Sequence, residues 1–114
     1  MSDPTEVVDA QVDAYFARDL ERFVACYARD AVITNAAGDL LADGHAGIRR
    51  MYGDLFANSP QLAGRIVNRI VVGDFVADHE EVQGFNRPGS PDSIRAIAVY
   101  QVVAGKIGRV TLYF

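Results

Sequence analysis

The chain has 114 residues, half of them hydrophobic, and a formal net charge of −4. This length is typical of one domain, and no apolar run approaches the roughly 18 residues that cross a bilayer. The acidic N-terminal segment lacks the apolar stretch of a signal peptide, and no basic patch marks a nucleic-acid site. We therefore expect a soluble, cytoplasmic, single-domain protein that binds neither nucleic acid nor membranes.

Two helices are predicted at the N-terminal end. Asp3 and Pro4 are typical of a helix start, and Asp19 is the expected N-cap of a second, shorter helix that closes near Asp30. The apolar stripe of the first helix is Val8, Val12, Tyr15 and Phe16. The apolar stripe of the second is Leu20, Phe23, Val24 and Tyr27. The single cysteine, Cys26, lies between Ala25 and Tyr27 of this second helix and is expected to be a buried hydrophobic residue rather than a reactive thiol.

A strand pair and a third helix follow. Residues 31–35 have the pattern of a strand, Gly38 and Asp39 form a turn, and Leu40 and Leu41 lie beyond it. The third helix begins at Gly44 and is stopped by the sequence at 58–60, because its proline cannot continue the hydrogen-bond ladder. Its buried face is predicted to be Ile48, Met51, Tyr52, Leu55 and Phe56.

The second half is strand-like throughout. Strands are predicted at 62–72, 75–85, 94–103 and 107–114, with a loop at 86–93 that holds two prolines and a glycine. In the first of these strands, alternation predicts one face with Leu62, Ile66, Asn68, Ile70 and Val72. Arg65 and Arg69 take the opposite face, where they are placed to pair with acidic residues of a neighbouring strand. The chain is therefore expected to form an α+β domain, with its helices on one face of a curved sheet.

Three segments, 23–33, 44–49 and 99–107, resemble the nuclear transport factor 2-like superfamily, and within it the SnoaL-like and ketosteroid-isomerase-like branch. The resemblance implies one SnoaL-like domain over residues 1–114. It implies a cone-shaped curved antiparallel sheet packed against three N-terminal helices (a cystatin-like roll) around a deep apolar cavity. It also implies a small hydrophobic molecule as partner and a homodimer formed through the outer face of the sheet.

The catalytic residues of the steroid isomerases do not carry over to this chain. In that family a carboxylate moves a proton between carbons, while a tyrosine and a protonated aspartic acid stabilise the enolate oxygen. By the resemblance these three positions fall on Asn35, near Gln11, and on Ala98. A carboxamide accepts no proton at neutral pH, so the same mechanism with the same residues is not expected.

His79 and Glu81 are the strongest remaining catalytic pair. They lie two residues apart on a predicted strand, so their side chains project from the same face. By the resemblance, that face, shared with Phe75 and Ala77, looks into the cone. A histidine beside a glutamate in an apolar cavity is suited to general-base chemistry near neutral pH. The alternative is that both face solvent or a dimer partner.

The predicted substrate-binding residues are Tyr15, Asn35, Tyr52, Tyr100, Phe56 and Phe114. A tyrosine combines an apolar body with one polar end, which suits a pocket wall, although each is equally at home in a core. Asn35 alternatively satisfies the neighbouring turn. His45 and His79 do not make a metal site, and no phosphate loop, nucleophile elbow or dinucleotide fingerprint is present, so neither metal nor cofactor is expected.

Three functions remain open from the sequence. The first is a cofactor-free acid–base enzyme, an isomerase, cyclase or dehydratase, with His79 as base and Glu81 orienting it. The second is a binding module that holds the same kind of ligand without converting it. The third is a dimerisation domain whose cone is filled by side chains.

Overall fold

The computed structural model describes residues 3–85 and 92–114, so most of the predicted loop at 86–93 lies outside the described residues. The described elements are α1 (Pro4–Ala17), α2 (Leu20–Ala25), β1 (Tyr27–Asn35), β2 (Leu40–Asp43), α3 (Gly44–Asn58), β3 (Ala63–Val72), β4 (Phe75–Gln83), β5 (Ser93–Val103) and β6 (Lys106–Tyr113). Within these residues, no helix has the length and apolar character needed to cross a bilayer.

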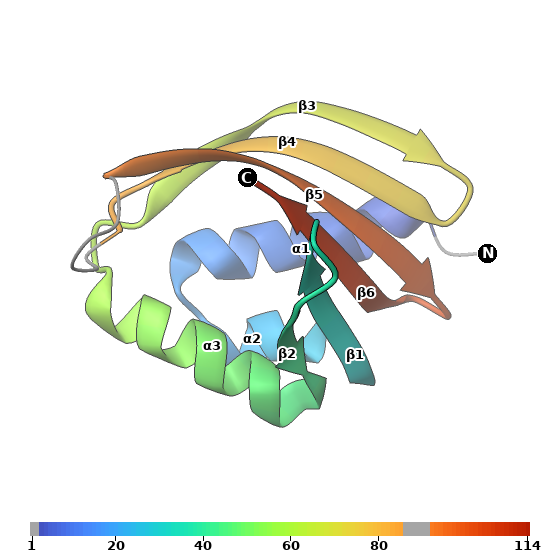
Figure 1. Ribbon diagram of the computed structural model, residues 1–114, viewed down its shortest axis with the longest axis horizontal. Helices are drawn as coiled ribbons and strands as arrows, with labels where there is room; N and C mark the ends of the chain where they lie inside the picture. Colours follow the sequence, from blue (N-terminus) through green and yellow to red (C-terminus); the bar gives the residue numbers. More distant parts are fainter. Residues whose placement is uncertain (1–2, 86–91) are drawn as a thin grey trace.

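The strands form one six-stranded sheet in the order β2-β1-β6-β5-β4-β3. Neighbouring strands are antiparallel, except that β1 and β6 run parallel. Figure 1 shows β3, β4 and β5 arching over the helices, while β6, β1 and β2 continue the curve down one side. The three helices therefore lie against the concave face, which confirms the predicted α+β architecture.

The helices begin where the sequence predicts. The Asp3 carboxylate Oδ1 accepts a hydrogen bond from the Thr5 amide at 2.9 Å, and Pro4 occupies the first turn of α1. The Asp19 Oδ1 accepts one from the Arg22 amide at 3.2 Å. Both side chains satisfy amide groups that have no partner within the helix, which is the role expected of N-caps.

The second helix ends earlier than predicted, at Ala25 rather than near Asp30. Residues 27–30 instead belong to β1, which pairs with β6. The Ile107 amide donates to the Cys26 carbonyl at 2.9 Å, and the Lys106 ammonium donates to the Ala25 carbonyl at 2.7 Å. These tertiary bonds satisfy carbonyls at the end of α2, so contacts from β6 override the local helical pattern.

A bulge in β3 changes the predicted faces of that strand. Ile66 pairs with Glu80 and Asn68 with His79, so Val67 is an extra residue. Because one inserted residue reverses the alternation, Ile66 lies on the concave face, and Asn68 lies on the outer one. The prediction that Arg65 and Arg69 share a face is therefore wrong, although each pairs with an acidic residue of β4 as expected.

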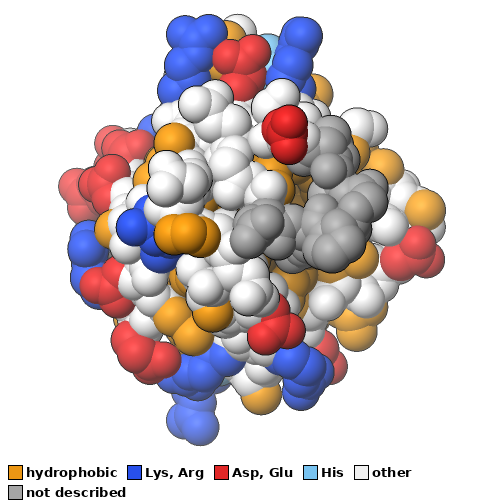
Figure 2. Space-filling view, turned by 90° about the vertical axis from the view of Figure 1, so that its left-hand side faces the viewer, with side chains coloured by type: hydrophobic (Ala, Val, Ile, Leu, Met, Phe, Trp, Pro, Cys, Tyr) orange, Lys and Arg blue, Asp and Glu red, His pale blue; other side chains and the backbone are white. Residues whose placement is uncertain are grey.

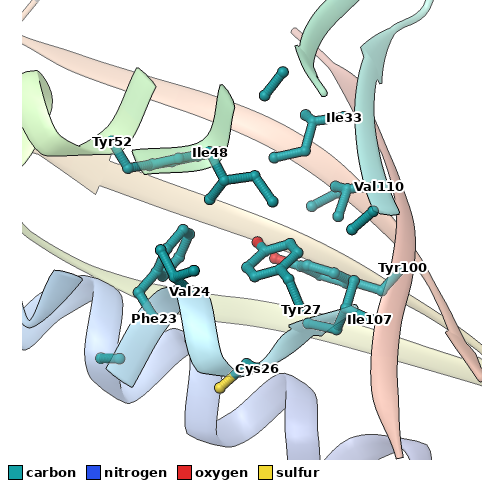
Figure 3. Close-up of a cluster of buried hydrophobic side chains, with 14 of the residues drawn as sticks. Phe23, Val24, Cys26, Tyr27, Ile33, Ile48, Tyr52, Tyr100, Ile107 and Val110 are labelled. Atoms are coloured by element: carbon teal, nitrogen blue, oxygen red, sulfur yellow. The ribbon is translucent and has the colours of Figure 1, made fainter. Parts of the chain in front are cut away.

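The core centres on aromatic rings contributed by all three helices and β1. Phe23 is fully buried, and its ring lies 4.6 Å from that of Tyr52 and 5.1 Å from that of Tyr27, between ring centroids. Figure 3 shows these side chains converging with aliphatic residues of β1 and β6. Cys26 is buried beside them, as predicted, and burial raises the pKa of its thiol.

Candidate functional site

A cavity of about 180 Å³ lies between α1, α3 and the concave face of the sheet. It is lined by Gln11, Val12, Tyr15, Phe16, Tyr27, Met51, Tyr52, Leu55, Glu80, Val82, Phe85, Ile94, Tyr100, Val110, Leu112 and Phe114. Phe85 and Ile94 place it toward the end of the sheet where β4 stops and β5 starts. Figure 2 faces this end of the molecule, where most charged side chains stand toward the outline and hydrophobic and uncharged atoms lie nearer the middle.

Glu80 brings the one charged side chain among the described residues that line this cavity. Along β4 it lies on the same face as Val76, Asp78 and Val82, and these three side chains are buried against the helices. The opposite face of β4 carries Phe75, Ala77, His79 and Glu81. The expectation that His79 and Glu81 look into the cone is therefore wrong, because their side chains have the opposite parity on the strand.

The surroundings of Glu80 favour its neutral form. Burial, and secondarily the negative charge of Asp78, raise the pKa of its carboxyl from 4.5 to about 7. No described residue gives this carboxyl a hydrogen bond or an ion pair. At neutral pH it is therefore divided between the acid and the carboxylate, a state that suits a group which both removes and returns protons.

A chain of ion pairs close to Glu80 links β4 and β3 to α1. The fully buried Asp78 carboxylate accepts two hydrogen bonds from Arg69, from Nε at 2.6 Å and from Nη2 at 2.9 Å. Arg69 Nη1 donates to Asp9 Oδ1 on α1 at 2.7 Å. These bonds, led by those to Asp78, raise the pKa of the Arg69 guanidinium. The chain fixes α1 over β3 and β4, so it sets the position of the cavity wall.

Tyr27 and Tyr100 supply hydroxyl groups to the cavity. Both side chains are buried and line it, and their hydroxyl ends point into the same region in Figure 3. Burial is the largest influence that raises the pKa of each phenol well above 10. The phenols therefore remain protonated and are able to donate a hydrogen bond to a ligand oxygen.

Gln11 contributes a buried carboxamide from α1. Its side chain is 5% exposed, and it lines the same cavity. Its Oε1 has no hydrogen-bond partner among the described residues. Buried polar atoms nearly always have a partner, so this oxygen needs a specific explanation.

The predicted substrate-binding residues divide into two groups. Tyr15, Tyr52, Tyr100 and Phe114 line the cavity, and their role in ligand binding stays a prediction. Phe56 does not line it, because its ring packs in the core at 5.5 Å from those of Tyr15 and Phe23, between centroids.

Asn35 is likewise absent from the cavity lining. Its Oδ1 accepts from the amides of Ala37 and Asp39, each at 3.0 Å, and its Nδ2 donates to the Asp39 carboxylate. The side chain is thus used by the turn between β1 and β2, as the alternative interpretation held.

His79 faces a shallow groove of about 550 Å³ on the outer side of the sheet. The groove is lined by Asn68, Ile70, Ala77, His79, Arg95, Ala96, Ile97, Tyr113 and Phe114. Over residues 3–85 and 92–114, no three histidine, cysteine or acidic side chains cluster in a way that would hold a metal ion.

A curved sheet closed by three helices around an apolar cavity defines the nuclear transport factor 2-like class, which includes the ketosteroid-isomerase-like folds. Residues 8–110 match the family model described as SnoaL-like domain. The chain therefore belongs to the SnoaL-like domain family. No curated protein is significantly similar to it in sequence.

Solved structures support the same fold. An uncharacterised cystatin-fold protein from Novosphingobium aromaticivorans is 30% identical, with 98% of each chain covered and a TM-score of 0.88. A candidate polyketide cyclase from Sinorhizobium meliloti is 21% identical, over 94% of this chain and 93% of that one, at a TM-score of 0.78. A ketosteroid-isomerase-like protein from Catenulispora acidiphila, solved with trimethylamine, is 17% identical, over 96% and 85%, at a TM-score of 0.79.

Proposed function

We propose that the protein binds a small hydrophobic molecule in the concave cavity and catalyses cofactor-free proton transfer on it, with Glu80 as the acid–base group. The observation that carries this proposal is the placement of Glu80, a carboxyl group in a wall otherwise made of apolar and uncharged side chains. Its pKa of about 7 matches the pH at which it would work. Similarity in fold to a candidate polyketide cyclase supports a reaction of this class.

The proposed step moves one proton between two carbons of a β,γ-unsaturated ketone. The Glu80 carboxylate removes the proton beside the carbonyl. The electron pair of that C–H bond forms a carbon–carbon double bond, and the π pair of the carbonyl moves onto its oxygen. Tyr27 or Tyr100 donates a hydrogen bond to the enolate oxygen, which stabilises the developing charge. The Glu80 carboxylic acid then returns the proton to another carbon, so the protein ends unchanged and the reaction consumes no second reagent.

The cavity volume limits the substrate. At about 180 Å³ it is smaller than the roughly 300–1,000 Å³ typical of sites for drug-sized ligands. A single-ring ketone is therefore a better candidate than a steroid. This agrees with the departure of Asn35 and Ala98 from the steroid-isomerase pattern.

Isomerisation of cyclohex-3-enone to cyclohex-2-enone tests the proposal, because the conjugated product is followed by its ultraviolet absorbance. We expect the wild type to accelerate it and Glu80→Gln to lower kcat/KM by about 100-fold or more, the contribution usual for a general base. Glu81→Gln, the same change one residue along on the outer face, is the matched control and should retain activity. Equal rates for wild type and Glu80→Gln would overturn the role of Glu80.

The second candidate function is a non-catalytic module. The outer face of the sheet favours a module that forms dimers. Large apolar side chains are exposed there on β3, β4, β5 and β6, among them Ile70, Val72, Phe75, Ile97 and Tyr113. Association of two copies through this face would cover these side chains and the His79 groove.

A wild type that binds cyclohex-3-enone without isomerising it would support a module that only binds its ligand.

A further inference from the structure

We propose that the concave cavity also binds a small organic cation, a protonated amine, whose charged end pairs with the Glu80 carboxylate and whose hydrocarbon part lies among the aromatic side chains of the wall. Such a ligand adds a second chemical class to the proposed function. Its binding requires the cavity but not the proton transfer proposed above.

Glu80 is a charged group without a counter-ion in the wall. It is the one charged side chain among the described residues that line the cavity, and none of the described residues pairs with it. Arg69, a cation on the neighbouring strand β3, is already used: its Nε and Nη2 donate to Asp78, and its Nη1 donates to Asp9. A buried carboxylate is costly unless a positive charge or hydrogen bonds compensate it. A cationic ligand supplies both.

The Glu80 carboxyl is open to the cavity. Within the described part of the chain, Gln11 Oε1 is the side-chain oxygen that is both sealed from solvent and without a hydrogen-bond partner. The Glu80 oxygens also lack a partner but are not sealed, so they retain accessible surface in the cavity that Glu80 lines. Burial, and next the charge of Glu80, raise the pKa of Tyr100, which places the carboxyl close to the phenol of another lining residue.

The rest of the wall suits an alkylammonium group. Seven of the described lining residues are tyrosine or phenylalanine, among them Tyr15 on α1, Tyr27 on β1, Tyr52 on α3 and Tyr100 on β5. Aromatic rings attract ammonium groups through the negative charge of their faces, most strongly away from water. A metal ion fits less well, because no three histidine, cysteine or acidic side chains of the described residues gather to hold one.

Binding of a cation is coupled to the proton on Glu80. Burial and then the charge of Asp78 raise the pKa of this carboxyl to about 7, so the free cavity holds the acid below that pH and the carboxylate above it. An alkylammonium stays protonated up to about pH 10. Affinity should therefore rise with pH through 7, because the carboxylate is the form that pairs with the ligand. The other titratable side chains of the described lining are Tyr15, Tyr27, Tyr52 and Tyr100, and none of them carries a positive charge.

The test compares cyclohexylammonium with cyclohexanol, which has the same ring and a similar size but no charge. Titration calorimetry measures both affinities for the wild type, Glu80→Gln and Glu81→Gln at about pH 8.5, and for the wild type at about pH 5.5 as well. Glu81→Gln is the matched control, because it makes the same change on the outer face of β4.

We expect cyclohexylammonium to bind the wild type about ten-fold or more tightly than cyclohexanol does at the higher pH. Glu80→Gln should reduce this preference below about three-fold and leave the affinity for cyclohexanol nearly unchanged, whereas Glu81→Gln should keep the preference. The affinity of the wild type for the cation should be about 30-fold lower at the lower pH, where a carboxyl with a pKa of about 7 is largely protonated. Cyclohexanol should show no such change.

Three results would each overturn the inference: equal affinities of the two compounds for the wild type, a preference that persists in Glu80→Gln, or a cation affinity that does not rise with pH. Failure of both compounds to bind has the same consequence. If Glu80→Gln does not fold, the two wild-type measurements still decide.

The inference and the proposed function fail separately. Isomerisation of cyclohex-3-enone without binding of cyclohexylammonium upholds the proton transfer and removes the cation. Binding of cyclohexylammonium with the expected dependence on Glu80 and pH, but without isomerisation, upholds the cation site and contradicts the proton transfer.

Discussion

Glu80 links the stability of the fold to pH. Burial and the charge of Asp78 raise the pKa of its carboxyl from 4.5 to about 7. Between pH 4.5 and about 7, Glu80 is protonated in the folded chain and has lost this proton in the unfolded chain. The contribution of this group to stability is therefore fully present below pH 4.5 and is lost as the pH rises through 7. The difference between 7 and 4.5 corresponds to about 3 kcal/mol.

We expect Glu80→Gln to remove this pH dependence. We measure the free energy of unfolding in urea for the wild type and subtract that of the variant. This difference should fall by about 3 kcal/mol as the pH rises from 4.5 through about 7. Among the described residues, the titratable groups that interact with Glu80 are Asp78 on β4, Tyr100 on β5 and Tyr27 on β1, and the variant retains all of them. Glu81→Gln is the control. A difference between wild type and Glu80→Gln that stays constant with pH would contradict the buried, protonated state.

Asp78 is expected to contribute far more to stability than Asp9, although both pair with Arg69. The Asp78 side chain is fully buried, whereas that of Asp9 is 62% exposed. Asp78→Asn leaves a largely buried guanidinium without its main partner and should cost about 3 kcal/mol in urea unfolding. Asp9→Asn changes a solvated pair and should cost less than about 1 kcal/mol. Equal losses would show that burial does not govern this ion-pair chain.

At the scale of the element, the sequence predicts the type and order of the helices and strands well, and their faces less well. The apolar spacing in α1 and α3 and the alternation in the C-terminal strands are strong local signals, and β3, β4, β5 and β6 each lie within about two residues of their predictions, whereas β1 begins four residues earlier than predicted. The end of α2 was misplaced because the bonds that stop it come from Lys106 and Ile107, some eighty residues away.

The residues available to the site depend on which face of β4 lies against the cavity, and the sequence carries only a weak signal for that face. Both parities of this strand contain apolar residues at the start, Phe75 and Ala77 on one face and Val76 on the other. Only the far end separates them, because Val82 is apolar and Gln83 is polar. That contrast assigns Glu80 to the cavity. The bulge at Val67 in β3 had no such local signal, since it depends on the pairing of two strands.

The backbone just beyond the end of β4 also tolerates little change. Gly84 has φ +86°, and a side-chain carbon there would collide with the backbone carbonyl of Gln61. We expect Gly84→Ala to lower the free energy of unfolding by about 3 kcal/mol. Gly73, with φ +57° and open space around it, is the control, and Gly73→Ala should cost only about 1 kcal/mol. Urea unfolding measures both, and equal effects would contradict the close approach at Gly84.

At the scale of the molecule, the sheet separates two surfaces of different character. Its concave face holds Glu80, Tyr27 and Tyr100 around the cavity, while its outer face exposes apolar side chains from four strands. An apolar face of this extent is typical of surfaces that associate. We propose that the partner is a second copy of the chain, as the resemblance leads us to expect. The outer-face position of His79 fits the alternative interpretation that it faces a dimer partner.

Ile97 lies near the middle of the outer face and is the sharpest test of association. It is 47% exposed, pairs with His79 on β4 and Tyr113 on β6, and lines the outer groove. If two copies meet here, Ile97→Lys buries a charge at the interface and should convert a dimer to a monomer in sedimentation experiments. Leu40→Lys is the matched control, since Leu40 is 58% exposed on β2 at the far edge of the sheet and should leave the dimer intact. Because the cavity lies on the opposite face, the Ile97→Lys monomer should still bind ligands. If the wild type sediments as a monomer, the two copies do not associate. If a dimer survives Ile97→Lys, the two copies associate through another surface.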